Sequence, residues 1–229
     1  MMDLNSALVQ EVLAVAEGII SENRVLSARL LYTEARRQVR GEQKALLAII
    51  NFLLEHRILV EGSKLTKELV LSNLHRRNIY EYIRTNRGAK FSTIRDAYEG
   101  TTGSSGQLIW HLQLLLKFNY VKRIKFKRFT IFLPMDMDEE EGLVTFFTRD
   151  PLNNKILKLL NTQGPLKRTD LYEALDAPRE KIHYRVKVLL ETNLISALGE
   201  GEKEVYINPE KITSLTDILK KNNEAGGKQ

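Results

Sequence analysis

A cluster of positive charge at residues 121–132 offers the most distinctive chemistry in the sequence. The stretch VKRIKFKRFTIF contains five cations and no anion. Lysine and arginine bind phosphates without reading the bases, because each neutralised phosphate releases condensed counterions. A lysine-rich strand edge can also serve only to prevent strand pairing. We interpret the cluster as a phosphate-binding surface, made of Lys122, Arg123, Lys125, Lys127 and Arg128.

The residues between these cations predict the local structure. Ile124 and Phe126 share one parity along the chain, whereas Phe129 and Ile131 share the other. Alternation with period two is typical of a strand, and a slip by one residue is typical of a hairpin turn. We therefore expect two short strands that meet at residues 127–128, with the cations near the tip exposed to solvent.

A second set of polar residues lies just before an apolar helical stripe that begins at Leu108. It consists of Ser104, Ser105 and Gln107. In a helix-turn-helix protein the third helix enters the major groove by its N-terminal residues, and glutamine can bond to adenine there. A Gly/Ser turn that simply caps a helix would use the same residue types. The hypothesis is that these three side chains contact base edges.

A second helix, expected near residue 180, has cations where the helix that begins near Ser105 has small polar residues. It offers Arg179, Lys181 and Arg185 as contacts to DNA. The segment expected at the tip of its β-wing, residues 199–204, carries three Glu against one Lys. Such a tip should repel phosphates. We predict that this unit contacts DNA through those three side chains or not at all, and that its wing faces a protein partner or solvent.

The elements that must position these residues recur along the chain. LLLKFNYV at 114–121 aligns with VLLETNLI at 188–195, an offset of 74 residues. Each copy reads as helix, Gly- or Pro-containing break, helix, short turn, helix and extended pair, which is a helix-turn-helix with a β-wing. Asp150 and Pro151 signal a helix start, since an N-cap precedes a proline at the first helical position.

These patterns predict a mainly α protein with small β-wings, of the α+β class, built from three tandem winged helix-turn-helix domains. An all-helical dimerisation or effector module is the alternative for residues 6–70, and a two-stranded wing at 58–70 would decide between the two. The expected divisions are an N-terminal helical or winged-helix-like domain at 1–74, a central winged-helix domain with the basic wing at 75–135, an acidic linker at 136–149, a C-terminal winged-helix domain at 150–208, and a terminal helix with a disordered tail at 209–229.

Two charged segments outside the main cluster leave alternatives open. The turn of the N-terminal unit is surrounded by cations that suit either DNA contact or a solvated helix face. They are Arg36, Arg37, Arg40 and Lys44. The acidic stretch DMDEEE at 136–141 could fold back on the basic wing and inhibit it, or it could be a solvated linker.

Composition narrows the functional classes. The chain of 229 residues has 35 Lys+Arg against 29 Asp+Glu, a net charge of +6 and a pI near 9.4, which suits a polyanionic partner. The absence of cysteine excludes disulfides and thiolate metal sites. No stretch reaches the roughly 18 apolar residues of a membrane span, so we expect a cytoplasmic protein. The four histidines lack metal-type spacing and no catalytic motif is present, so we expect no enzyme activity, cofactor or metal.

The runs at 79–121 and 156–195 resemble the paired winged-helix units of archaeal predicted transcription regulators close to the ArsR and MarR groups. The aromatic-His-Leu step of that family matches Trp110, His111 and Leu112, and its usual Gly near the end of the third helix is replaced by Asn in both copies. The resemblance implies binding to double-stranded DNA. Winged helices also serve as protein-interaction modules, as in endosomal sorting complexes or basal transcription assemblies, so a scaffold is the alternative function.

Apolar stripes on the first and last helices suggest a possible second subunit. A doubled half-site multiplies a modest single-site affinity, so we predict a homodimer, although each stripe could instead cover its own domain. The stripes are Leu8, Val12, Val15 and Ile19, and Ile212, Leu215, Ile218 and Leu219.

Overall fold

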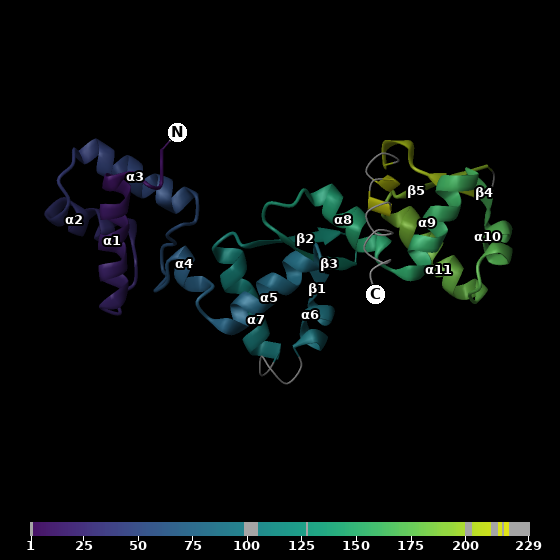
Figure 1. Cartoon of the computed structure of the whole chain (residues 1–229), viewed down its shortest axis with the longest axis horizontal. Coiled ribbons are helices and arrows are strands. Elements are labelled where there is room, and N and C mark those ends of the chain that lie inside the picture. Colours follow the sequence, from purple (N-terminus) through teal and green to yellow (C-terminus); the bar gives the residue numbers. More distant parts are fainter. Residues whose placement is uncertain are drawn as a thin grey trace. The chain divides into compact units, whose positions relative to one another are not determined.

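The computed structural model describes residues 2–98, 105–126, 128–199, 203–211, 215–216 and 218–219. Over these residues the chain is mainly helical with two small three-stranded sheets, which confirms the expected α+β class (Figure 1). Contacts divide the chain into two compact units. The first contains residues 1–82 and 92–122, and the second contains residues 83–91 and 123–229.

Three helices form the N-terminal part of the first unit and pack on one another (Figure 1). They are α1 (Ala7–Ser21), α2 (Ala28–Gln38) and α3 (Gln43–Glu55). The apolar stripe of α1 is buried in the shared core at Val12, Val15 and Ile19. The stripe that suggested a second subunit is therefore used to cover this domain.

The segment after α3 has no wing. No strand is present between residues 56 and 66, all of which lie in the described part of the chain. The backbone there bonds instead to the loop before α2, because Gly62 N donates to Leu26 O at 2.9 Å and Leu26 N donates to Ser63 O at 3.1 Å. A short helix, α4 (Lys67–Val70), follows. The expected extended pair at 58–70 is wrong, and the all-helical arrangement describes this part of the chain.

The next helices contain the first of the two long sequence copies. They are α5 (Leu74–Thr85), α6 (Phe91–Ala97) and α7 (Ser105–Lys117). The predicted stripe on α7 is confirmed, since Leu108, Leu112 and Leu115 are buried. The Tyr98 hydroxyl donates to the Asn78 carbonyl at 2.7 Å and so ties the end of α6 to α5.

Both copies include a small sheet with the same strand order. In the first sheet β3 lies between β1 and β2, and in the second β6 lies between β4 and β5. The hairpin predicted around residues 127–128 agrees with strands that end and begin on either side of them. The strands are β1 (Ala89–Lys90), β2 (Val121–Phe126), β3 (Phe129–Pro134), β4 (Leu166–Lys167), β5 (Ile195–Leu198) and β6 (Glu204–Ile207).

The turns from α7 to β2 and from α11 (Arg179–Glu191) to β5 have the same backbone conformation at one asparagine. Asn119 has φ 53° and Asn193 has φ 56°, the left-handed conformation in which asparagine is tolerated. The expectation that Asn replaces Gly at these two positions without loss of the turn is confirmed.

The C-terminal copy contains α9 (Pro151–Gln163), α10 (Arg168–Ala174), α11 (Arg179–Glu191) and the 3₁₀ turn η1 (Pro209–Lys211). The start signal of α9 is confirmed, since the Asp150 carboxylate accepts from Leu152 N and Asn153 N, both at 3.1 Å. In the segment beyond η1, Leu215, Ile218 and Leu219 are buried in the core of this copy. Ile212 and the tail at 220–229 lie outside the described residues.

The segment interpreted as an acidic linker contains a helix, α8 (Glu139–Thr148). Asp138 caps it by accepting from Glu140 N at 2.9 Å and Glu141 N at 3.0 Å. Its other face is apolar, with Val144 and Phe147 buried. The acidic composition hid this helix because its charges occupy only the first turn, where they suit the helix dipole.

The acids of α8 are paired away from the basic wing. Glu141 pairs with Arg87, and the Glu140 carboxylate lies 2.7 Å from Lys211 Nζ. The hypothesis that this acidic stretch folds back on the wing cations therefore has no support among these contacts.

Three phenylalanines connect the hairpin to the C-terminal copy. The Phe129 ring at the start of β3 lies 5.2 Å from Phe147 and 6.4 Å from Phe146, and these two rings are 5.2 Å apart. Edge-to-face pairs of this kind add to the burial of the rings. The three residues pack within one core with α9 and α11, so the second unit joins hairpin, α8 and C-terminal copy.

Candidate nucleic-acid interface

Strand β2 presents its cations to solvent by strand alternation. Arg123 and Lys125 are exposed, whereas Ile124 and Phe126 are half-buried and Lys122 is intermediate. Ile124 packs against the small cluster built on β3. The apolar positions hold the strand down on one side, so Arg123 and Lys125 project from the other, whereas Lys122 shares the apolar side. Lys127 lies outside the described residues.

Arg128 at the hairpin tip is engaged by its own chain. Its guanidinium lies 5.1 Å from the Tyr184 ring and 5.2 Å from the Phe129 ring, and its Nη2 is 4.0 Å from Glu191 Oε2. The side chain remains 46% exposed. Arg128 is therefore partly neutralised, and the expectation of a wholly solvent-facing tip needs this correction.

The first turn of α7 is polar and open. Ser105 and Gln107 are exposed, and Ser104 lies outside the described residues. Two large apolar side chains on the same helix are also exposed, Ile109 at 46% and Trp110 at 51%. The helix thus offers small polar groups at its start and an aromatic ring one turn later.

A buried arginine lies behind Trp110. Arg76 on α5 is only 5% exposed, and its Nε donates to Val70 O at 2.5 Å. Its guanidinium lies 5.6 Å from the Trp110 ring, and burial lowers the pKa of Arg76 from its ordinary value. This contact was not anticipated from the sequence. The sequence spacing could have indicated that Arg76 is buried, because it lies three and seven residues before the buried Ile79 and Ile83 on the apolar face of α5.

His111 on α7 is buried beside two further basic side chains. It is 6% exposed, and its ring centroid lies 5.7 Å from that of His75. Burial is the main cause that lowers the pKa of His111 below its ordinary 6.5, and the charges of Arg76 and His75 act in the same direction. Its Nδ1 has no hydrogen-bond partner among the described residues.

This environment predicts a pH-dependent stability. Below about pH 6.5 the unfolded chain takes up a proton at residue 111 that the folded chain resists, so the free energy of unfolding should fall as pH decreases. One proton accounts for at most about 1.4 kcal/mol per pH unit. In urea unfolding between about pH 5 and 8, His111→Gln should show a shallower decline than the wild type. The exposed control His56→Gln should keep the wild-type slope; equal slopes for all three proteins would refute the expectation.

Of the three DNA contacts predicted on α11, two are exposed side chains and one is paired within the chain. Arg179 and Lys181 are exposed near the start of the helix. Arg185 instead pairs with Asp150, with Nη2 2.6 Å from Oδ2, and Asp150 is the cap of α9. Tyr184, which is 46% exposed, lies beneath Arg128. Of the three predicted contacts, Arg179 and Lys181 therefore pair with no carboxylate among the described residues, and the Arg179 guanidinium lies 6.0 Å from the Tyr172 ring.

Positive charge is concentrated in the central copy. Residues 75–135 contain 12 Lys or Arg and 3 Asp or Glu, whereas residues 1–74 contain 9 of each. Residues 136–229 contain 14 basic and 17 acidic residues. The whole excess of positive charge thus comes from the segment with the basic hairpin, and a polyanion would be attracted there most strongly.

Other kinds of site find no support in the described part of the chain. No group of three or more His, Cys, Asp or Glu there is placed to hold a metal ion. None of the helices described is both long and apolar enough to cross a membrane.

The chain is similar in sequence to an uncharacterized HTH-type transcriptional regulator of Methanocaldococcus jannaschii. The two are 28% identical over 172 residues, which is 74% of this chain and 43% of the relative. The chain therefore spans less than half the length of that protein. No protein-family profile matches the chain.

Proposed function

We propose that the chain is a double-stranded DNA-binding transcription regulator whose central copy makes the main contact. The main support for this proposal is the concentration of positive charge, since residues 75–135 contain 12 basic and only 3 acidic residues. In this proposal the element sets α5 to β3 and α9 to β6 are tandem winged helices. The distant HTH-type regulator supports the same class.

In the proposed complex the central copy divides its contacts by chemistry. Helix α7 enters the major groove, where Ser105 and Gln107 meet base edges through hydroxyl and amide groups. The exposed Arg123 and Lys125 of β2 hold phosphates, which fix the position of the protein without reading sequence. Lys122, which is intermediate in exposure, lies on the other face of β2 and could reach a phosphate only from there.

The C-terminal copy has a different proposed role, which is to brace the hairpin. This copy and α8 belong to residues 136–229, which contain 17 acidic and 14 basic residues. The copy contacts the hairpin through the phenylalanine cluster and the Arg128 contacts with Tyr184 and Glu191. Any DNA contact from this copy would come from Arg179 and Lys181. The same surplus of acid favours the second candidate function, a scaffold that binds a protein partner.

A titration with duplex DNA separates the two functions. We expect the wild-type protein to bind a fluorescent mixed-sequence duplex of about 40 base pairs with a micromolar or tighter Kd at roughly 50 mM salt, and to weaken steeply as salt rises. A scaffold without affinity for DNA would leave the anisotropy unchanged at about 10 μM protein. That second result would remove the DNA-binding function.

A further inference from the structure

The N-terminal helices contain a helix-turn-helix of their own that lacks a wing. Helices α2 and α3 are joined by residues 39–42, and a turn of three to four residues that often contains glycine is typical of this motif. Gly41 occupies the turn, and a Cβ there would lie 3.2 Å from Leu8 Cδ1 on α1. The glycine therefore lets the turn pack closely under α1.

One face of α3 remains open while the other forms the core. Leu46, Ile49, Ile50 and Leu53 are buried. The exposed positions follow helical spacing and run from the start of the helix to its last turn. They are Gln43, Lys44, Leu47, Ala48, Asn51 and Glu55. Lys44 near its start and Glu55 at its end are the charged residues of this face. Between them the face combines amides, which can bond base edges, with alkyl groups, which can meet thymine methyls.

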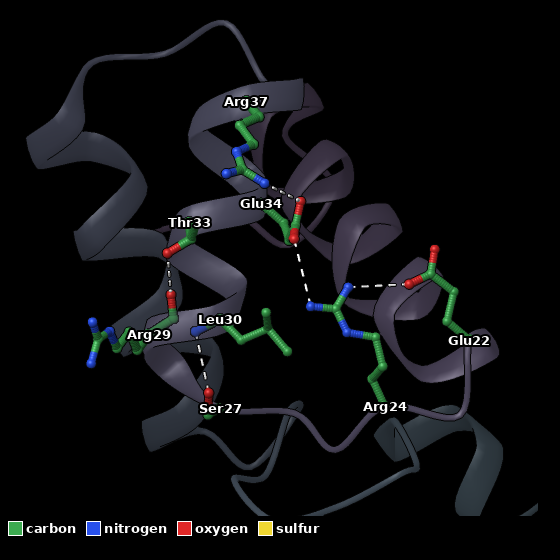
Figure 2. Close-up of polar contacts among 8 residues, drawn as sticks. All are labelled: Glu22, Arg24, Ser27, Arg29, Leu30, Thr33, Glu34 and Arg37. Atoms are coloured by element: carbon green, nitrogen blue, oxygen red, sulfur yellow. Dashed lines mark hydrogen bonds and ion pairs between the residues drawn. The ribbon is translucent and has the colours of Figure 1, made fainter.

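Cations flank this face at the end of α2 and in the turn. Arg36, Arg37, Arg40 and Lys44 are all exposed. Figure 2 shows how acids engage part of the region: Glu34 lies between Arg37 at 3.7 Å and Arg24 at 3.6 Å. Arg24 also pairs with Glu22 at 3.1 Å, while no described carboxylate pairs with Arg36, Arg40 or Lys44.

The α2 helix is fixed locally before it reaches these cations. The Ser27 hydroxyl accepts from Leu30 N at 3.2 Å and caps its first turn, and the Thr33 hydroxyl donates to Arg29 O at 2.9 Å (Figure 2). Acidic side chains, by contrast, are exposed on α1 at Glu11 and Glu17. Residues 1–74 are neutral overall, and four cations lie at the junction of α2 and α3 together with the exposed Glu42 in the turn.

We propose that α3 is a second DNA-reading helix, with Arg36 and Arg40 on phosphates and Gln43 and Asn51 on base edges. This inference rests on the proposed function of the central copy. The first HTH helix normally crosses the backbone while the second enters the groove, which suits the cations of α2 and the amide and alkyl side chains on the exposed face of α3.

A physical joint links this motif to the central copy. The Tyr120 hydroxyl, just after α7, donates to Lys67 O at 2.7 Å, and Lys67 Nζ lies 5.5 Å from the Tyr120 ring. Both residues belong to the first compact unit. Two binding surfaces on one tether raise the effective concentration of the second once the first is bound, so each can be weak alone.

The test compares charge-matched variants of the full chain on the mixed-sequence 40-base-pair duplex. Arg36→Gln/Arg40→Gln removes two exposed cations of the proposed surface, whereas Arg57→Asn/Lys64→Gln removes two exposed cations beyond the far end of α3. Asparagine suits position 57, where φ is 55°. We expect the slope of log K against log salt to decrease by about two units for the first variant and to stay unchanged for the control.

The outcomes distinguish this inference from the function on which it rests. A wild-type slope for Arg36→Gln/Arg40→Gln, together with a reduced slope for Arg123→Gln/Lys125→Gln, would overturn the second reading helix and leave the central copy intact. The reverse pattern would support α3 and contradict the central copy. If the wild-type protein does not bind duplex at all, both proposals fail together. Equal decreases in slope for the α2 variant and its control would also overturn the proposal, since they would indicate diffuse attraction.

Discussion

Replacing Arg123 and Lys125 with glutamine should decrease the salt dependence of DNA binding by about two units of slope, one for each phosphate that is no longer neutralised. If the affinities of variant and wild type converge near 1 M salt, this slope difference corresponds to an affinity decrease on the order of 100-fold at 0.1 M. Both side chains are exposed on β2, so the decrease should come from the missing charges rather than from unfolding. The measurement is an anisotropy titration at several salt concentrations.

The matched control for this experiment removes two exposed cations from the C-terminal copy. Lys155 lies on α9 and Lys187 on α11, and neither belongs to the proposed interface. Lys155→Gln/Lys187→Gln should bind DNA with the wild-type slope. A decrease in slope as large in the control as in the hairpin variant would show that net charge alone attracts DNA and would remove β2 from the mechanism.

The largest stability effect is expected at Phe147. Its ring is 3% exposed and lies within 5.2 Å of both Phe129 and Phe146, so truncation leaves a cavity where the hairpin, α8 and the C-terminal copy meet. Phe147→Ala should decrease the free energy of unfolding by about 3–5 kcal/mol. Urea unfolding followed by circular dichroism measures this change.

A conservative variant keeps this prediction testable if the alanine protein fails to fold. Phe147→Leu retains most of the volume and should cost less than about 1.5 kcal/mol. In the leucine background, removal of the Phe129 ring should cost less than in the wild type, because the edge-to-face pair contributes about 0.5–1.5 kcal/mol of its own. An unfolding free energy of Phe147→Ala within about 1 kcal/mol of wild type would show that this cluster does not hold the second unit together.

The sequence predicted the parts of the fold that depend on local signals. Period-two alternation around Ile124 and Ile131 defined the two strands, and the helical stripe from Leu108 to Leu115 defined α7. The Asp150 cap was correct because capping depends only on neighbouring residues. Exposure of Arg123 and Lys125 followed from the same alternation.

The features that sequence reasoning missed depend on distant contacts. Nothing local indicates that Leu26 bonds to residues 62 and 63, which replaces the expected wing with a bound loop. Likewise, the acidic start of α8 hid an apolar face that becomes evident only when Phe129 packs against it. The engagement of Arg128 by Tyr184 and Glu191 joins residues about 60 positions apart in the chain, which a strand pattern cannot foresee.

Lysine acylation can show whether the β2 hairpin of the central copy contacts DNA, as proposed. The protein is treated with an acylating reagent, with and without a saturating mixed-sequence duplex, and modification at each lysine is quantified by mass spectrometry. We expect the duplex to protect Lys122 and Lys125 by roughly tenfold or more, since a lysine paired with phosphate is shielded from reagent. Lys155 and Lys187 should react as they do without DNA. Unchanged reactivity at Lys122 and Lys125 on fully bound protein would contradict the claim.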